Sequence, residues 1–295
     1  MRERSAVLKW DYQNITYGID ERQRIDIAFP NNKQTHAIVY FHGGAYFSGN
    51  KSQYPSFLSD YAGKNVIASI DYRVINQDNN IHIGDILSDV DAALLKIIDF
   101  SRINGVNIKN FILIGHSAGG HIGLLYGYKT KKIKIAACIS LAGPTDFTDD
   151  LGWSSRTMWG KNIEERLSFL SWMGSRLTKH QIKLERYDWT RQKNYSLFKN
   201  HIMAISPIIH VLKNKKIPPT FLVYACNDDQ VPYSNAERLI TLLKNTEKPS
   251  ILITPSKKGD SHMLGGVIYS DDGPIFFDGQ PWVAELKTWL EEYLE

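Results

Sequence analysis

Cysteine is scarce in this chain of 295 residues, which contains only Cys138 and Cys226. Two thiols in a chain of this size do not suggest a disulfide scaffold. The N-terminus is charged and is followed by no apolar stretch of the kind found in secretory signals. We therefore expect a cytoplasmic protein.

Long apolar runs and basic stripes are missing as well. No segment approaches the length that a membrane-spanning helix requires. The net charge is +4, but lysine and arginine are scattered, and their densest cluster, residues 129–134, is typical of a solvated helix end. Nucleic-acid binding would require basic residues interleaved with aromatics. Since no His, Cys or Asp spacing resembles a zinc site either, we expect no nucleic acid, membrane span, metal or cofactor.

The most informative segment that is present reads Gly115-His116-Ser117-Ala118-Gly119-Gly120. It follows the apolar run 111–114 and precedes a stretch of helical character. A serine hydroxyl becomes an effective nucleophile when a sharp strand-to-helix turn presents it to a base and to oxyanion-stabilising N–H groups. Small residues two positions on either side suit such a crowded turn. The pattern Gly-x-Ser-x-Gly is weak alone, but here its context agrees on both sides.

A second segment, His42-Gly43-Gly44-Ala45-Tyr46, follows another apolar run, residues 36–41. A Gly-Gly pair at a strand end lets backbone N–H groups approach a ligand closely. The same segment is compatible with a simple strand-exit turn. Its occurrence together with the serine turn favours a contribution to an oxyanion hole.

A nucleophilic serine requires a base, and a histidine base requires a carboxylate that holds its tautomer. One chain order used by serine hydrolases places the acid and then the histidine after the serine. After residue 210 the chain has a single histidine, His262, which lies in a loop that follows the apolar run 251–254. We therefore predict His262 as the base.

Two aspartates compete for the role of the acid. Asp228 and Asp229 both follow the predicted strand 221–224. We favour Asp228, because a carboxylate close to the strand end is better fixed than one further into the turn. Asp146, which follows the predicted strand 135–141, is a weaker candidate and is more typical of a turn residue.

Taken together, these segments resemble an α/β-hydrolase esterase of the hormone-sensitive-lipase-like and acetyl-esterase-like kind, which has feruloyl-esterase-like and kynurenine-formamidase-like relatives. Asp71-Tyr72-Arg73 and Val231-Pro232 belong to the resemblance, which extends from about residue 25 to the C-terminus. It implies an α/β-hydrolase fold that needs no cofactor. Because the motifs are similar to those of acetyl-esterase-like relatives, it also implies a modest pocket for short acyl groups.

Carried over residue by residue, the resemblance implies a Ser117 nucleophile, an Asp228 acid and a His262 base. It implies oxyanion donors at Gly44 and Ala118, with Ala45 as a further candidate. Two departures concern the pocket. Many relatives carry a third glycine where this chain has Ala45, and a glycine and an aromatic residue where it has Met263-Leu264.

Apolar runs alternate with helical patterns along the chain, as is typical of a mostly parallel sheet with helices on both faces. We expect strands near residues 10–17, 24–29, 36–41, 66–71, 111–114, 135–141, 221–224 and 251–254. We expect helices near residues 52–62, 83–103, 119–129, 234–243 and 282–293. The acidic residues of the helix 83–103 are expected on its solvent face.

Residues 147–206 interrupt this alternation with a helical, polar and aromatic pattern. Four of the seven tryptophans lie there: Trp153, Trp159, Trp172 and Trp189. Because tryptophan suits sites that are apolar on one side and wet on the other, we predict a helical cap over the cleft, with Trp153, Trp159 and Trp172 at the substrate. The cap would be inserted into a core domain formed by residues 1–146 and 207–295. The alternative is a small satellite core without substrate contact.

The sequence thus predicts a serine carboxylesterase that hydrolyses short to medium acyl esters through an acyl-enzyme intermediate. An amidase, formamidase or peptidase with the same triad stays an alternative, because the motifs do not separate esters from amides. A ligand-binding protein that keeps the fold without the chemistry is disfavoured, because it would not need all three triad residues. The expected partner is a small-molecule ester, and a homodimer is a candidate assembly.

Overall fold

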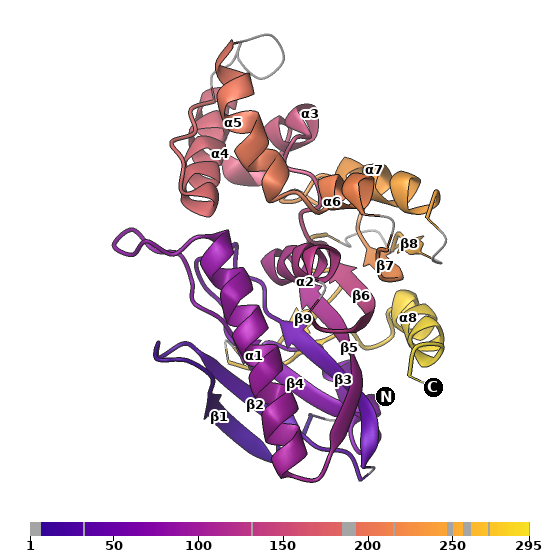
Figure 1. Ribbon diagram of the computed structural model, residues 1–295. Helices are drawn as coiled ribbons and strands as arrows, with labels where there is room; N and C mark the ends of the chain where they lie inside the picture. The colour runs from indigo at the N-terminus through magenta and orange to yellow at the C-terminus, as the bar shows by residue number, and fades with distance from the viewer. Residues whose placement is uncertain are drawn as a thin grey trace.

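An eight-stranded sheet with the strand order β1-β2-β4-β3-β5-β6-β7-β8 organises the computed structural model (Figure 1). The strands are β1 (Tyr12–Thr16), β2 (Arg24–Ala28), β3 (Gln34–Phe41), β4 (Val66–Asp71), β5 (Asn107–His116), β6 (Ile135–Leu141), β7 (Thr220–Val223) and β8 (Ile251–Ile253). β1 pairs antiparallel with β2, and β2 with β4, whereas all pairs from β4 to β8 are parallel. The structure describes residues 7–31, 33–130, 132–184, 193–214, 216–246, 250–255, 261–270 and 272–294.

The central strands are apolar along most of their length because both of their faces are buried. Alternate side chains of one strand point to opposite faces. In β3, Val39 and Phe41 join one hydrophobic cluster, and Ile38 and Tyr40 join the other. All four side chains are fully buried.

Helices cover both faces of the sheet. α1 (Ile83–Ile103), α2 (Ala118–Lys129), α6 (Pro207–Lys213) and α7 (Tyr233–Leu243) bury their apolar sides in the first cluster. The 3-10 helix η1 (Ser56–Tyr61) and α8 (Pro281–Glu291) pack on the opposite face. Figure 1 shows α1 and α2 together in front of the sheet, with α8 apart from them. This arrangement confirms the predicted α/β fold with helices on both faces.

Between β6 and α6 lie α3 (Asp150–Ser154), the 3-10 helix η2 (Thr157–Trp159), α4 (Ile163–Thr178) and α5 (Lys193–Ala204). Figure 1 shows α3, α4 and α5 stacked beyond one end of the sheet. The inner side of α4 is formed by buried Leu167, Leu170, Met173 and Leu177, at helical spacing. The segment is therefore helical as predicted, although its status as a separate domain stays a prediction. Trp189 lies outside the described residues.

Three expectations about the elements need correction or addition. The predicted helix 52–62 shrinks to η1, since Pro55 disfavours helical geometry at the residue before it. Asp89 of α1 does not face solvent: it is 1% exposed and pairs with the Arg73 guanidinium at 2.6 Å. The strands β9 (Val267–Ile268) and β10 (Ile275–Phe276), which form a separate antiparallel pair, were not predicted.

Candidate active site

Ser117 occupies a strained turn between β5 and α2. Its φ of 52° and ψ of −122° are unusual for a residue with a side chain. A Cβ on Gly115 would lie 2.3 Å from the carbonyl carbon of Gly119, and a Cβ on Gly119 would lie 2.0 Å from the carbonyl oxygen of Phe41. The two glycines of the motif are therefore required by close backbone contacts, and the turn holds the serine at the carboxyl end of β5.

The structure brings Ser117, His262 and Asp228 together in one chain of hydrogen bonds. Nε2 of His262 is 2.8 Å from Oγ of Ser117, and Nδ1 is 2.8 Å from Oδ2 of Asp228. The other carboxylate oxygen of Asp228 accepts the N–H groups of Gln230 at 2.8 Å and Val231 at 2.9 Å. His262 is 5% exposed and Asp228 is 1% exposed. The backbone thus orients the acid, and the acid orients the imidazole toward the serine.

The competing aspartates lie elsewhere. Asp229 is exposed, so its carboxylate is not held beside the histidine. Asp146 is fully buried, but its partners are not histidines. Its carboxylate accepts a hydrogen bond from the N–H of Thr148 and forms an ion pair with Arg238 at 3.0 Å. Sequence reasoning had missed Arg156, whose guanidinium donates to the carbonyl oxygen of Asp228.

The predicted oxyanion donors lie around Ser117. Gly44, Ala45 and Tyr46 have φ values of 103°, 51° and 73°, so the loop after β3 turns sharply toward the serine. Ala118 is the first residue of α2, where an N–H group has no acceptor within the helix. Among the described residues, none accepts a hydrogen bond from the N–H of Gly44, Ala45 or Ala118. These groups are therefore free to bind an oxyanion.

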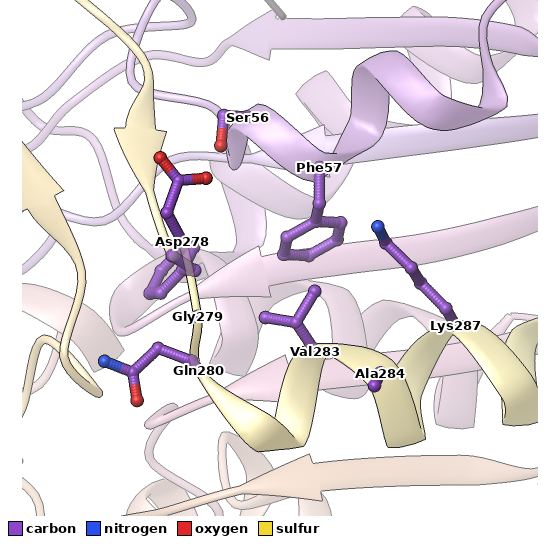
Figure 2. A pocket seen from close by; sticks show the side chains of 9 residues that line it. Ser56, Phe57, Asp278, Gly279, Gln280, Val283, Ala284 and Lys287 are labelled. Atoms are coloured by element: carbon purple, nitrogen blue, oxygen red, sulfur yellow. The ribbon is translucent and has the colours of Figure 1, made fainter. Parts of the chain in front are cut away.

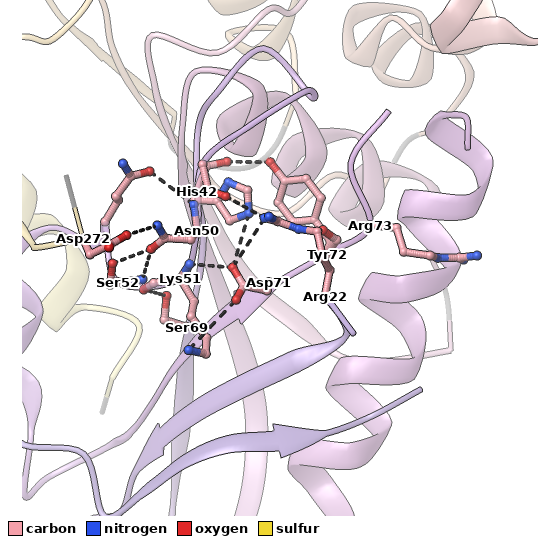
Figure 3. Close-up of polar contacts among 12 residues, drawn as sticks. Arg22, His42, Asn50, Lys51, Ser52, Ser69, Asp71, Tyr72, Arg73 and Asp272 are labelled. Atoms are coloured by element: carbon pink, nitrogen blue, oxygen red, sulfur yellow. Dashed lines mark hydrogen bonds and ion pairs between the residues drawn. The ribbon is translucent and has the colours of Figure 1, made fainter. Parts of the chain in front are cut away.

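A polar network holds the loop from behind, as Figure 3 shows. The His42 ring stacks on Tyr72 with 4.2 Å between ring centroids, and the Tyr72 hydroxyl donates to the His42 carbonyl at 2.7 Å. Nε2 of His42 lies 3.7 Å from the Asp71 carboxylate, which also accepts the backbone N–H of Lys51 at 2.6 Å. The Arg22 guanidinium lies 3.8 Å from the same carboxylate. Burial lowers the pKa of His42 to about 3, so its imidazole is neutral at pH 7.

His121, one turn after Ser117 on α2, is a second residue whose contacts sequence reasoning missed. Its Nε2 lies 2.7 Å from the carbonyl of Ile205, and its Nδ1 lies 2.9 Å from the Tyr46 hydroxyl. Because a carbonyl can only accept, Nε2 carries the proton and Nδ1 accepts from Tyr46. Burial lowers the pKa of His121 to about 4. The neutral ring therefore joins the oxyanion loop to the chain leaving α5.

His116 precedes Ser117 and contacts the loop that contains His262. Its Nε2 donates to the carbonyl oxygen of His262 at 2.9 Å, which adds a backbone restraint to the residue that carries the basic imidazole. Burial, together with the neighbouring His262, lowers the pKa of His116 to about 4. His116 was visible in the motif, but its contacts were not.

Two cavities meet at Ser117. A small apolar one of about 20 Å³ is lined by Ala45, Tyr46, Ser117, Ala118, Pro144, Phe147, Trp153, Trp159, Met173, Gln230 and Val231. A larger open cleft of about 420 Å³ is lined by Tyr40, Gly43, Gly44, Ala45, Phe47, Ser48, Gly49, Gln53, His116, Ser117, Met158, Trp159, Gln230, His262, Met263, Ile268 and Ile275. We call them the small cavity and the open cleft.

The tryptophans take different places around these cavities. Trp153 is buried at the wall of the small cavity, stacked on Phe147, and its indole N–H donates to Asp146. Trp159 lines both cavities, and its indole N–H donates to the Gln230 carbonyl at 2.9 Å. Trp172 is 39% exposed, packs against Phe47 and lines neither cavity.

A further hollow of about 230 Å³ lies between η1 and α8 and contains none of the residues discussed above (Figure 2). Ser56 and Phe57 form one side, and Val283, Ala284 and Lys287 of α8 form another. Its lining includes none of Ser117, Asp228 and His262.

The sheet order, the strand-to-helix serine turn and the position of the acid and histidine after it define an α/β-hydrolase fold. Residues 25–243 match the family model BD-FAE, an α/β-hydrolase family of feruloyl-esterase-like proteins, and the match covers more than half of the chain. The protein belongs to the BD-FAE family. A comparison with curated proteins finds no match.

Solved structures share the fold at low sequence identity. Esterase B from Lactobacillus rhamnosis superposes with a TM-score of 0.69 and 14% identity, over 99% of this chain and 86% of its own. The esterase Est2 from Thermogutta terrifontis gives 0.63 and 19%, over 92% and 88%. A truncated carbohydrate esterase from gut microbiota gives 0.61 and 17%, over 88% and 92%. Among the described residues, no helix has the length and apolar character to cross a membrane.

Proposed function

We propose that the protein is a serine esterase in which Ser117 is the nucleophile, His262 the general base and Asp228 the acid that orients it. The observation that carries the proposal is the hydrogen-bonded chain from Oγ of Ser117 to the Asp228 carboxylate, with 2.8 Å at each step. This geometry lets the imidazole accept the hydroxyl proton as the oxygen attacks a carbonyl carbon.

In the first half of the reaction, Oγ of Ser117 bonds to the ester carbonyl carbon and its proton passes to Nε2 of His262. The negative charge on the carbonyl oxygen is stabilised by the N–H groups of Ala118 and of Gly44 or Ala45. The carbon–oxygen bond to the alcohol then breaks, and the leaving oxygen takes the proton from Nε2.

In the second half, water attacks the acyl-enzyme while Nε2 of His262 takes its proton. The carboxylic acid leaves as Oγ of Ser117 regains a proton from the imidazole. Asp228 stabilises the imidazolium in both halves, and its own two backbone hydrogen bonds keep it from turning away. Apart from the ester and water, both halves use only groups of this chain.

Structural neighbours support this chemistry. Esterase B from Lactobacillus rhamnosis is described as inhibited by a tributyrin phosphonate, and Thermogutta terrifontis Est2 as phosphonylated by sarin. Reagents of this class react with activated serines, and both proteins share the fold of this chain. The geometry at Ser117 supports extending that reactivity to this chain.

The small cavity supports a preference for short acyl groups. At about 20 Å³ it has room for little more than one water molecule, so an acetyl group fits more readily than a longer chain. We expect p-nitrophenyl acetate to exceed the hexanoate in kcat/KM, and the reverse order would contradict the acyl preference.

Labelling by a fluorophosphonate probe tests the proposed chemistry directly. We expect mass spectrometry to find the adduct on Ser117 and to find none in Ser117→Ala. Absence of labelling in the wild type would favour a binding protein without chemistry. Turnover of matched esters and amides then separates an esterase from an amidase, and we expect the ester to be preferred.

A further inference from the structure

The two cavities at Ser117 differ in size and in their contact with the base. The small cavity is closed by Phe147, Trp153 and Met173, whereas the open cleft is about twentyfold larger, at about 420 Å³ against about 20 Å³. The hydrogen-bonded pair of Trp159 and Gln230 borders both. A substrate bound at Ser117 therefore has one confined side and one spacious side.

Proton transfer decides which side takes the alcohol. The leaving oxygen must come within hydrogen-bond reach of Nε2 of His262 when the carbon–oxygen bond breaks. His262 lines the open cleft and does not line the small cavity. The alcohol thus extends into the open cleft, and the acyl group enters the small cavity beside Ala118.

The open cleft has mainly apolar walls. Its side chains from four separate segments are aromatic, aliphatic or thioether groups: Phe47, Met158, Trp159, Met263, Ile268 and Ile275. Besides Ser117 and His262, its polar side chains are uncharged or neutral groups: Tyr40, Ser48, Gln53, His116 and Gln230. Of the described residues that line it, none is Asp, Glu, Lys or Arg. Such walls stabilise an apolar ring, and the described residues among them offer no ionic partner to a charged alcohol.

We propose that the preferred substrate is an ester of a small acyl group with a neutral aromatic alcohol. This inference rests on the proposed esterase function. It places the bulky aromatic part of the substrate on the alcohol side, because the small cavity has no room for it on the acyl side. Hydrolysis releases the aromatic alcohol and a short carboxylic acid, with water as the only other reactant.

The test compares three neutral esters. They are naphth-2-ylmethyl acetate, a monoacetylated methyl glucoside, and methyl ferulate, whose aromatic ring lies on the acyl side. We expect kcat/KM for the naphthylmethyl ester to exceed that of each of the others by roughly tenfold or more, as apolar pocket contacts usually provide. The sugar acetate has the better leaving group, so a preference for the naphthylmethyl ester reports binding rather than intrinsic reactivity.

Two neighbouring substitutions on β9 locate the alcohol. Ile268 lines the open cleft and is 40% exposed, whereas Val267, its neighbour, is 47% exposed and lines neither cavity. Successive side chains of a strand point to opposite sides, so Val267→Asn is a matched control for Ile268→Asn. We expect Ile268→Asn to raise KM for the naphthylmethyl ester about fivefold. Val267→Asn should leave this KM unchanged.

Faster turnover of the sugar acetate or of methyl ferulate would overturn the inference, and so would equal effects of the two β9 variants. Fluorophosphonate labelling of Ser117 keeps this result distinct from a failure of the esterase function. A protein that is labelled but prefers another alcohol retains the proposed chemistry and refutes only the substrate class. A protein that is not labelled refutes both.

Discussion

The sheet and the helical segment between β6 and α6 differ in how completely their side chains are buried. In the sheet, the strands that carry the serine turn and the oxyanion loop are flanked by fully buried side chains on both faces. In the helical segment, α4 buries one stripe, while Leu151, Met158 and Trp172 are 78%, 55% and 39% exposed. The sheet therefore fixes the positions of the residues around Ser117, and the helical segment covers them.

From this difference we expect kcat to depend mainly on the sheet and the choice of ester to depend mainly on the helical segment. Ser117, the oxyanion donors, Asp228 and His262 all follow strands of the sheet. Among the described residues, the helical segment contributes cavity walls, such as Trp153, Trp159 and Met173, and the Arg156 guanidinium at the Asp228 carbonyl. We therefore expect substitutions near the sheet to change kcat, and substitutions in the helical segment to change which ester is preferred.

The largest effect is expected at the acid. Asp228→Asn should reduce kcat by about four orders of magnitude, because the imidazole loses its tautomer and the charge that stabilises it. Asp229→Asn, one residue further on, is exposed and should keep nearly full activity. Steady-state kinetics on one short ester measures both. A large loss in the second variant would transfer the acid role to Asp229.

A smaller loss is expected at the support of the oxyanion loop. Tyr46→Phe removes the hydroxyl that donates to His121 and should lower kcat about tenfold with little change in KM, since the loop's N–H groups act mainly on the transition state. Tyr128→Phe is the matched control, because it removes a buried hydroxyl bonded to Thr220 and away from the site. If the two variants have equal midpoints of urea unfolding and also equal kcat values, Tyr46 has only a structural role.

Selectivity should respond at the helical segment. Trp159→Ala joins the small cavity to the open cleft and should raise the ratio of kcat/KM for butyrate over acetate roughly tenfold. Trp172 lines neither cavity, so Trp172→Ala should leave the ratio unchanged. Chain-length series of p-nitrophenyl esters measure the ratio. If Trp159→Ala instead lowers kcat/KM for butyrate and for acetate equally, the helical segment does not determine which ester is preferred.

The smallest effect concerns acid stability. Burial lowers the pKa of His42 to about 3 and those of His116 and His121 to about 4, below the unfolded value of about 6.5. The unfolded chain then binds more protons, so these residues cost stability as the pH falls from 6.5 toward 4 and cost none above 7.

Each such histidine contributes a slope of at most about 1.4 kcal/mol per pH unit in that window. His121→Asn should therefore reduce the pH dependence of the unfolding free energy by up to that amount. Urea unfolding between pH 7.5 and 4.5 measures the slope for wild type and variant. An unchanged slope would show that His121 is not held neutral in the sheet region.

Sequence reasoning succeeded where one local pattern sufficed. The bounds of β4, β6 and α1 match the predicted ranges, because uninterrupted apolar runs and helical periodicity report burial directly. It missed β9 and β10, although two short β-branched and aromatic runs flank a turn containing Gly273. That pattern is typical of a hairpin.

The amino-acid sequence by itself determined the fold class, the serine turn and the candidates for the acid and the base, because each depends on residues adjacent along the chain. Only the tertiary structure placed Asp228 rather than Asp229 beside His262, linked His121 to Tyr46, and divided the space around Ser117 into a confined and a spacious side. Those outcomes depend on distances between segments far apart in the chain, which no local pattern encodes. Side-chain packing sets such distances, and this packing exists only once the whole sheet and its covering helices have assembled.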